Sequence, residues 1–149
     1  MIEYATGDIL DTRCDYVVCP VNMVGVMGAG LAAQMERSIP GLAHAYTEAI
    51  KTGSLQLGRT YAIERFKVVL FATKDHWKYP SRLEYISAGM NHLTRWIQSS
   101  GVRSIAIPAL GCGLGRLTLA QVEPVIQAAL VSLPDVRVEL YGFGGGDAK

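Results

Sequence analysis

The sequence predicts a single α/β domain in which helices cover both faces of a sheet. The chain has 149 residues, of which 50% are hydrophobic, and this is enough to build one domain with a sizeable core. Short apolar runs rich in β-branched residues alternate with helical patterns. Several of these runs are apolar without alternation, which is typical of strands buried on both faces. We expect the domain to span residues 1–141, with residues 142–149, GFGGGDAK, as a flexible tail.

Strands and helices are expected to alternate along the chain. The β-branched apolar runs predict strands at residues 2–6, 16–21, 60–64, 68–73, 104–108 and 137–141. Helical patterns predict two helices in the first half of the chain, at residues 30–38 and 42–51. The strands therefore alternate with helices in the order that is typical of a layered α/β domain.

Two capping boxes predict where the later helices begin. Ser81 opens an S-x-x-E pattern, and apolar residues then recur three or four positions apart, at Leu83, Ile86, Met90, Leu93 and Ile97. Thr118 opens a second pattern of this type, T-x-x-Q. Because Pro124 follows it, the last helix is expected either to begin near Glu123 or to bend at the proline.

Composition and charge limit the classes of function. The formal net charge is +1, which by itself demands no nucleic-acid partner. No apolar run approaches the ~20 residues that a membrane span requires, and the N-terminus lacks the basic region of a secretory signal. The three cysteines form no CxxC pair, so we expect no disulfide framework, no metal site and a cytoplasmic location. Residues 65–82 are a local exception, with five basic residues and one acidic residue.

Two glycine clusters follow predicted strands. The first is GVMGAG at residues 25–30, and the second is GCGLG at residues 111–115. Glycine lets the backbone approach a ligand closely, and amide N–H groups in such loops attract anions. Because ligands bind beyond the carboxyl ends of strands in α/β sheets, the two loops together indicate a site for two linked phosphates. Either loop alone could equally be a tight turn.

The loops fit neither of the common nucleotide-binding fingerprints. A P-loop needs G-x-x-x-x-G-K-[ST], and neither loop has it. The dinucleotide fingerprint is G-x-G-x-x-G, whereas residues 25–30 read G-x-x-G-x-G. No acidic residue ends a second strand about 20 positions later, where a dinucleotide's ribose would need one. Both of these nucleotide-binding classes are therefore disfavoured.

Three separated motifs resemble the macrodomain family. They are EYATGDIL, VVCPVNMVGVMGAGLAAQ and IPALGCGLG, and the resemblance covers nearly the whole chain, residues 2–141. The resemblance implies a three-layer α/β/α fold with a mixed central sheet. It also implies that the ligand is ADP-ribose. No cofactor and no metal ion is expected.

The resemblance implies roles for individual residues. Asp8 would accept a hydrogen bond from the adenine amino group, with Ile9 beside it, and Asn22 would hydrogen-bond the distal ribose. Tyr141 could stack near the adenine. The two loops and their flanks would contact the rest of ADP-ribose through Gly25, Val26, Met27, Gly28, Ala29, Gly30, Leu31, Thr73, Gly111, Cys112, Gly113, Leu114 and Gly115. Simpler roles stay open, because Asp8 could cap a turn, Asn22 could form one and Tyr141 could belong to the core.

The stretch FATKDHWKYPSRLEY, residues 71–85, resembles one branch of this family more specifically. The branch comprises the DNA-directed macrodomain antitoxins of the DarT–DarG system, which are related to terminal ADP-ribose protein glycohydrolase. The resemblance implies an N-glycosyl hydrolase that removes ADP-ribose from a nucleobase of single-stranded DNA, with Lys74 as the catalytic residue. It also implies ADP-ribosylated DNA and a DarT-like ADP-ribosyltransferase toxin as partners.

Lys74 can be argued on chemical grounds as well. It follows the predicted strand at 68–73, so its amine is expected at the sheet edge that carries the glycine loops. Cleavage of an N-glycosidic bond passes through a carbocation-like anomeric carbon, and a neutral amine could capture the opened sugar as an imine. The pKa of the lysine would then have to lie well below its ordinary ~10.4. The alternative is a lysine that pairs with phosphate or faces solvent.

Two departures from the family pattern leave part of the chemistry open. Protein-directed relatives carry an acidic residue at the last position of the second loop, where this chain has Gly115. Glycine at this position favours a DNA substrate but leaves the proton donor unassigned. Leu119 stands where relatives often place an aromatic residue, so the pattern does not identify the recognised base.

A basic and aromatic segment follows Lys74. Its members are His76, Trp77, Lys78, Tyr79 and Arg82. Aromatic rings stack on exposed bases and cations contact phosphates, so this segment is a candidate nucleic-acid surface. Two other functions stay open for the chain. One is a non-catalytic reader of ADP-ribose, and the other is a hydrolase that acts on ADP-ribosyl esters of proteins or on ADP-ribose 1″-phosphate.

Overall fold

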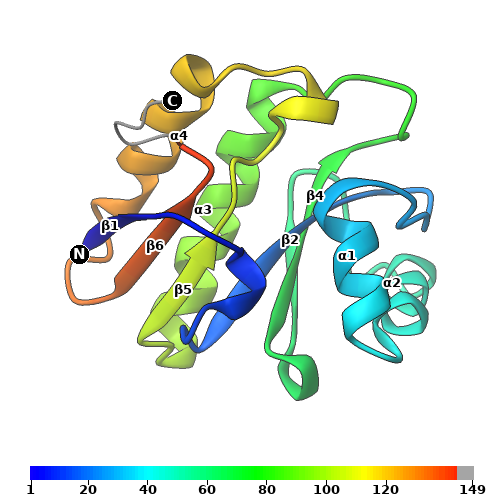
Figure 1. Ribbon diagram of the computed structural model, residues 1–149, viewed down its shortest axis with the longest axis horizontal. Coiled ribbons are helices and arrows are strands. Elements are labelled where there is room, and N and C mark those ends of the chain that lie inside the picture. Colours follow the sequence, from blue (N-terminus) through cyan, green and yellow to red (C-terminus); the bar gives the residue numbers. More distant parts are fainter. Residues whose placement is uncertain (144–149) are drawn as a thin grey trace.

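The computed structural model describes residues 1–143, in which six strands form one sheet (Figure 1). In chain order they are β1 (Ile2–Ala5), β2 (Tyr16–Asn22), β3 (Thr60–Ile63), β4 (Val68–Lys74), β5 (Ser104–Ile107) and β6 (Arg137–Tyr141). All six expected strands are confirmed. Both β2 and β4 extend one residue further than the sequence predicted. Phe143 is buried in the core, and the rest of the expected tail, residues 144–149, lies outside the described residues.

The sheet is mixed, as the family resemblance implied. Its strand order is β1-β6-β5-β2-β4-β3. The strand β3 pairs antiparallel with β4, whereas the other four pairings are parallel. The five parallel strands therefore end at one common edge of the sheet, where an α/β domain places its ligand.

Helices cover both faces of the sheet. The helices are α1 (Gly30–Ser38), α2 (Leu42–Lys51), α3 (Leu83–Ser100) and α4 (Leu119–Leu130). One buried cluster joins the sheet to α3 and α4, and a second joins it to α1 and α2. In β4, Val69 and Phe71 belong to the first cluster, while Val68 and Leu70 belong to the second. This two-sided burial explains why the strand sequences are apolar without alternation.

The two predicted capping boxes have different outcomes. The box at Thr118 is confirmed, because the Thr118 hydroxyl accepts from the Gln121 N–H at 3.2 Å and the Gln121 side chain accepts from the Thr118 N–H at 2.9 Å. The helix α4 therefore begins at Leu119, so a start near Glu123 is wrong, and Pro124 lies inside the helix. The predicted capping box at Ser81, by contrast, is wrong. In the described chain α3 begins at Leu83 after Arg82, with no side-chain cap, and Ser81 is buried instead.

Within residues 1–143, no helix combines the length and the hydropathy that crossing a membrane requires. The three cysteines, Cys14, Cys19 and Cys112, are free thiols.

Candidate active site

The ends of β2 and β4 bring two polar residues together. Asn22 ends β2, Lys74 ends β4, and the two are register partners in the parallel pair. Val21 pairs with Ala72 one step earlier, so β4 carries Thr73 as an extra residue. Bulges of this kind re-aim the side chains beside them and are common next to functional sites. Backbone pairing therefore places Asn22 and Lys74 side by side at the edge where ligands bind.

The first glycine loop is held by the Asn22 side chain. Asn22 Oδ1 accepts from the N–H groups of Val24 at 3.0 Å and Gly25 at 3.2 Å. Asn22 Nδ2 donates to the Val26 carbonyl at 3.0 Å. The Tyr46 hydroxyl, from α2, lies 2.7 Å from Asn22 Oδ1 and 2.5 Å from the Asn22 carbonyl oxygen. Burial raises the pKa of Tyr46 to about 12, so the phenol keeps its proton at neutral pH and can donate. Side-chain amide and phenol groups thus shape this loop from within.

The second glycine loop is shaped by its backbone. Gly111 and Gly113 have φ values of +76° and +65°, which L side chains rarely adopt. Gly113–Gly115 form one 3₁₀ turn, and the Leu117 N–H donates to the Gly111 carbonyl at 2.9 Å. A Cβ atom on Gly111 would lie 2.8 Å from the Leu117 side chain. The loop therefore requires glycine at position 111 for both conformation and space.

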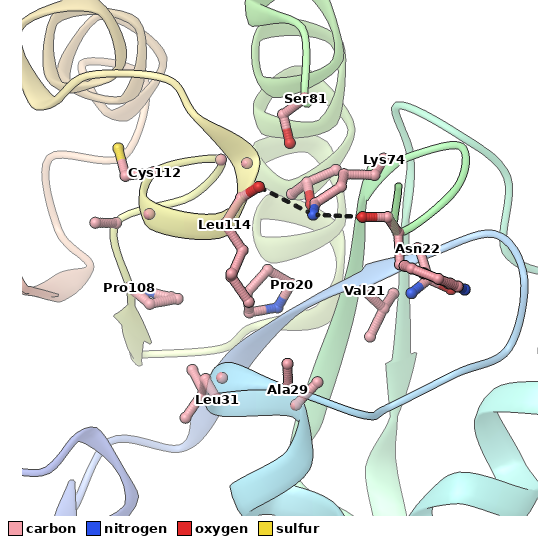
Figure 2. Close-up of a pocket in the computed structure, with 18 of the residues that line it drawn as sticks. Pro20, Val21, Asn22, Ala29, Leu31, Lys74, Ser81, Pro108, Cys112 and Leu114 are labelled. Atoms are coloured by element: carbon pink, nitrogen blue, oxygen red, sulfur yellow. Dashed lines mark hydrogen bonds between the residues drawn. The ribbon is translucent and has the colours of Figure 1, made fainter. Parts of the chain in front are cut away.

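The two loops border one cavity of about 560 Å³ (Figure 2). Small-molecule sites usually measure roughly 300–1,000 Å³, so the cavity has room for a nucleotide-sized ligand. Many of the predicted ligand residues line it, together with Lys74, the predicted catalytic residue, and Trp77 of the candidate nucleic-acid surface. The ligand residues are Asn22, Val26, Gly28, Ala29, Gly30, Leu31, Thr73, Gly111, Cys112, Gly113, Leu114 and Gly115. The strand ends thus assemble both glycine loops and the lysine around one space.

The Lys74 amine contacts two backbone carbonyls. Its Nζ donates to the Leu114 carbonyl at 3.2 Å and to the Trp77 carbonyl at 3.5 Å. Burial, and then the positive charge of Arg116, hold the pKa of Lys74 below its ordinary value. The two carbonyls engage two of the three N–H groups of the ammonium. When the amine loses a proton, it can keep both hydrogen bonds and carry its lone pair in the remaining tetrahedral position.

A family model described as Macro domain matches residues 18–126. The chain belongs to the macrodomain family. Among similar proteins, a DNA ADP-ribosyl glycohydrolase of Thermus aquaticus is 40% identical over 147 residues, which is 95% of this chain and 41% of that protein. The chain spans about two-fifths of the length of this Thermus aquaticus protein and of two similar DNA ADP-ribosyl glycohydrolases from Mycobacterium.

Solved structures of similar chains have the same fold. The macrodomain of Mycobacterium tuberculosis DarG superposes with a TM-score of 0.90 at 38% identity, over 95% of this macrodomain and 97% of that chain. The Thermosipho africanus DarTG protein in complex with ADP-ribose superposes with a TM-score of 0.84 at 31% identity, over 93% of this macrodomain and 41% of that chain. The three-layer α/β/α fold expected from the sequence is thereby confirmed.

Some predicted ligand residues of this macrodomain lie outside the cavity, namely Asp8, Ile9, Gly25, Met27 and Tyr141. Asp8 caps a short 3₁₀ turn, Ile9–Asp11, because its Oδ1 accepts from the Leu10 N–H at 2.9 Å. The Tyr141 hydroxyl donates to Glu139 at 2.9 Å, and Ala5 is the register partner of Tyr141. Tyr141 therefore ends β6 and Asp8 follows the end of the neighbouring strand β1, and their contact with adenine stays a prediction.

The basic and aromatic segment connects the cavity to the surface. Trp77 lines the cavity and is 52% exposed, while Tyr79 is 60% exposed. The His76 ring lies 5.0 Å from the Trp77 ring and 5.6 Å from the Tyr79 ring, measured between centroids. Lys78 Nζ lies 5.8 Å from the Trp77 centroid. His76, Lys78, Tyr79 and Arg82 themselves lie outside the cavity.

Sequence reasoning missed several residues of the cavity wall, namely Pro20, Val21, Ala32, Ser81, Pro108 and Ala109. Most of them directly flank strand ends or glycine loops, so their neighbourhood in the sequence could have indicated them. Ser81 gave a misleading signal, because its spacing from Glu84 matched a capping box. Cys112 lines the cavity as expected, and burial raises the pKa of its thiol, which fits a small loop residue rather than a nucleophile.

Proposed function

We propose that this macrodomain removes ADP-ribose from a nucleobase of single-stranded DNA and that Lys74 is the catalytic residue. The observation that carries the proposal is the position of the Lys74 amine. It lines a cavity between two glycine loops, is held by two carbonyls and has a lowered pKa. The relatives named DNA ADP-ribosyl glycohydrolase support the same reaction.

The proposed binding mode follows the edge of the sheet. The diphosphate would lie between the two glycine loops, whose amide groups attract anions. The distal ribose would then lie near Asn22 and Lys74, at the paired ends of β2 and β4. The adenine would lie over the ends of β1 and β6, near Asp8, Ile9 and Tyr141. The Thermosipho africanus structure in complex with ADP-ribose, which has the same fold, supports this choice of ligand.

The proposed reaction proceeds through the neutral amine. Lys74 Nζ bonds to the anomeric carbon of the distal ribose as the bond from this carbon to the base nitrogen breaks. The base leaves with the proton that the amine gives up, and opening of the ribose ring produces an imine. Water then hydrolyses the imine, which releases ADP-ribose and restores the amine. The Leu114 and Trp77 carbonyls would orient the amine before it attacks, by accepting its two N–H groups.

The experiment uses a single-stranded oligonucleotide with one ADP-ribosylated base. Lys74→Ala should reduce the release of ADP-ribose by at least about a thousandfold, because it removes the nucleophile. ADP-ribose affinity should change by less than about threefold, since the loops remain intact. Borohydride added during turnover should reduce the imine and leave a covalent ADP-ribosyl adduct on the wild-type protein.

The matched control is Lys51→Ala, which removes a lysine from the exposed end of α2 and should keep full activity. If Lys74→Ala keeps its activity, or loses affinity as much as turnover, Lys74 is not the nucleophile. If the wild-type protein binds ADP-ribose but releases none from DNA, the reader function replaces the proposal. Release from a glutamate-linked ester or from ADP-ribose 1″-phosphate, but not from DNA, would indicate the other hydrolase class.

We also propose that the basic and aromatic segment binds the DNA strand that carries the modified base. Trp77 connects the cavity to the surface, and the exposed rings of Trp77 and Tyr79 offer stacking faces beside Lys78 and Arg82. Tyr79→Ala should raise the KM for an ADP-ribosylated oligonucleotide about fivefold or more, since stacking contributes about 1–3 kcal/mol per base. It should not change the affinity for free ADP-ribose, and an unchanged KM would contradict this surface.

A DarT-like ADP-ribosyltransferase is the proposed biological partner. A fusion of a DNA ADP-ribosyl transferase with a DNA ADP-ribosyl glycohydrolase in Thermosipho africanus is 31% identical to this chain over 161 residues. Such a transferase would supply the modified DNA that this macrodomain repairs. Co-expression with a transferase of this kind should therefore relieve its toxicity, and Lys74→Ala should abolish the relief.

A further inference from the structure

Ser81 is a buried residue of the cavity wall whose hydroxyl is unused. Its exposed fraction is 4%. Across residues 1–143, Ser81 Oγ is the one buried side-chain polar atom without a hydrogen-bond partner. Leaving a buried hydroxyl unpaired costs about 1–3 kcal/mol, and most buried polar groups are therefore paired. Because this unpaired hydroxyl belongs to a residue that lines the cavity, we expect a bound ligand to supply its hydrogen-bond partner.

Within the described residues, Ser81 makes its structural hydrogen bond through the backbone and not through its hydroxyl. The α3 N-terminus, which follows at Leu83, is not capped by any side chain of the described chain. The backbone N–H of Ser81 donates to the Gly115 carbonyl at 2.9 Å, and this bond joins the segment after β4 to the second glycine loop. The backbone therefore performs the structural role, and the side chain is free to do something else.

Ser81 and Lys74 contact consecutive residues of the second loop. Lys74 Nζ donates to the Leu114 carbonyl, and the Ser81 N–H donates to the next carbonyl, that of Gly115. Figure 2 shows the Ser81 hydroxyl directed toward the side of the cavity that holds Lys74 and Leu114. A Cβ atom on Gly115 would lie 2.7 Å from Ser81 Oγ, so the hydroxyl occupies the space that a side chain at position 115 would need.

We propose that Ser81 is a substrate-binding residue whose hydroxyl hydrogen-bonds the distal ribose of the ADP-ribosyl group. The inference rests on the proposed function, because the reacting sugar must lie beside Lys74. A ribose hydroxyl both donates and accepts, so it satisfies both capacities of a serine hydroxyl. The diphosphate has the amide groups of the loops as its partners, whereas the sugar near Lys74 meets Ser81 and the carbonyls of the second loop.

The test compares Ser81→Ala with the wild-type protein by calorimetric titration of ADP-ribose and of ADP, which lacks the distal ribose. Ser81→Ala should weaken ADP-ribose binding about fivefold to tenfold, the loss expected for one hydrogen bond to a bound sugar. ADP binding should change less than about twofold. The midpoint of thermal unfolding without ligand should stay the same or rise, since the variant removes an unpaired buried hydroxyl.

Ser87→Ala is the matched control, because Ser87 is an exposed serine on α3, the helix that follows Ser81, and should leave both affinities and the unfolding midpoint unchanged. Ser81→Thr retains a hydroxyl and should recover most of the ADP-ribose affinity. An equal loss for ADP and ADP-ribose would overturn the assignment to the ribose. A lowered unfolding midpoint with unchanged affinities would make Ser81 a structural residue. A wild-type protein that binds no ADP-ribose would refute the proposed function itself, whereas unchanged ADP-ribose binding by Ser81→Ala refutes only this inference.

Discussion

The two glycine loops border the same cavity but are held in different ways. The first loop is organised by side chains, since Asn22 bonds the backbone of Val24, Gly25 and Val26, and Tyr46 bonds Asn22. The second loop is organised by glycine backbone geometry and by its carbonyls, which accept from Lys74 and from the Ser81 backbone. The first loop is thus held in place independently of Lys74, whereas the second loop is hydrogen-bonded to the Lys74 amine.

This difference indicates where mutations should separate binding from catalysis. Changes that loosen the first loop should weaken ligand binding without altering the lysine, because no hydrogen bond within residues 1–143 joins that loop to the Lys74 side chain. Changes in the second loop should affect Lys74 directly, since the Leu114 carbonyl and the Arg116 charge both act on its amine.

The largest expected effect is a loss of stability when a glycine of either loop is replaced by alanine. The size of each loss tests how strictly that loop requires glycine. Gly111→Ala should lower the free energy of unfolding by about 3 kcal/mol, because it combines an unfavourable positive φ with a Cβ crowded by three side chains, Leu117 at 2.8 Å, Ile86 at 3.2 Å and Ser81 at 3.4 Å. Gly25→Ala should cost about 1–2 kcal/mol, since its nearest neighbour, the end of the Thr47 side chain, lies at 3.3 Å and can yield. Chemical denaturation measures both losses. Equal losses would contradict the stricter packing of the second loop.

A smaller effect is expected from the phenol that supports the first loop. Tyr46→Phe removes the hydroxyl that bonds Asn22 and accepts from the Gly25 N–H, and should destabilise the protein by about 1–2 kcal/mol. ADP-ribose affinity should fall severalfold, while the pH at which turnover is half-maximal should not move. Tyr61→Phe, on the more exposed strand β3, is the matched control and should change neither quantity. A shifted pH profile in Tyr46→Phe would show that the first loop also acts on Lys74.

The smallest effect concerns the charge beside the lysine. Burial and Arg116 lower the pKa of Lys74, and the proposed reaction uses the neutral amine, which is present above that pKa. Turnover should therefore rise with pH as Lys74 deprotonates. Arg116→Gln removes one of the two causes, which should raise the pKa of Lys74 and move the pH profile to higher values. At a fixed pH below the Lys74 pKa, the variant should be slower.

The control for Arg116→Gln is Arg95→Gln, which removes an exposed cation from α3 and should leave the pH dependence of turnover unchanged. The measurement is single-turnover release of ADP-ribose from the modified oligonucleotide across the alkaline range. A profile that stays in place in Arg116→Gln would show that burial alone sets the pKa of Lys74.

Local sequence signals predicted the strands and the position of the lysine well. The apolar runs and glycine clusters report backbone preferences that act over a few residues, so β4 was expected to within one residue of its end and the loop at 111–115 was expected correctly. The S-x-x-E pattern at Ser81 failed for the opposite reason. A capping box depends on where the helix begins, and here the contact of Ser81 with Gly115 places the serine in the cavity wall before α3 starts.

The order of residues was sufficient to indicate an α/β domain, two phosphate-type loops and a lysine at a strand end, because these features depend on periodicity and on glycine. Which groups surround that lysine was decided by tertiary packing alone. The Leu114 carbonyl and the Arg116 charge come from a segment about 40 positions after Lys74, and the unpaired Ser81 hydroxyl follows Lys74 after a largely exposed turn. Hydrogen bonds and desolvation act over a few ångströms in space, so their partners depend on which strand ends lie next to each other.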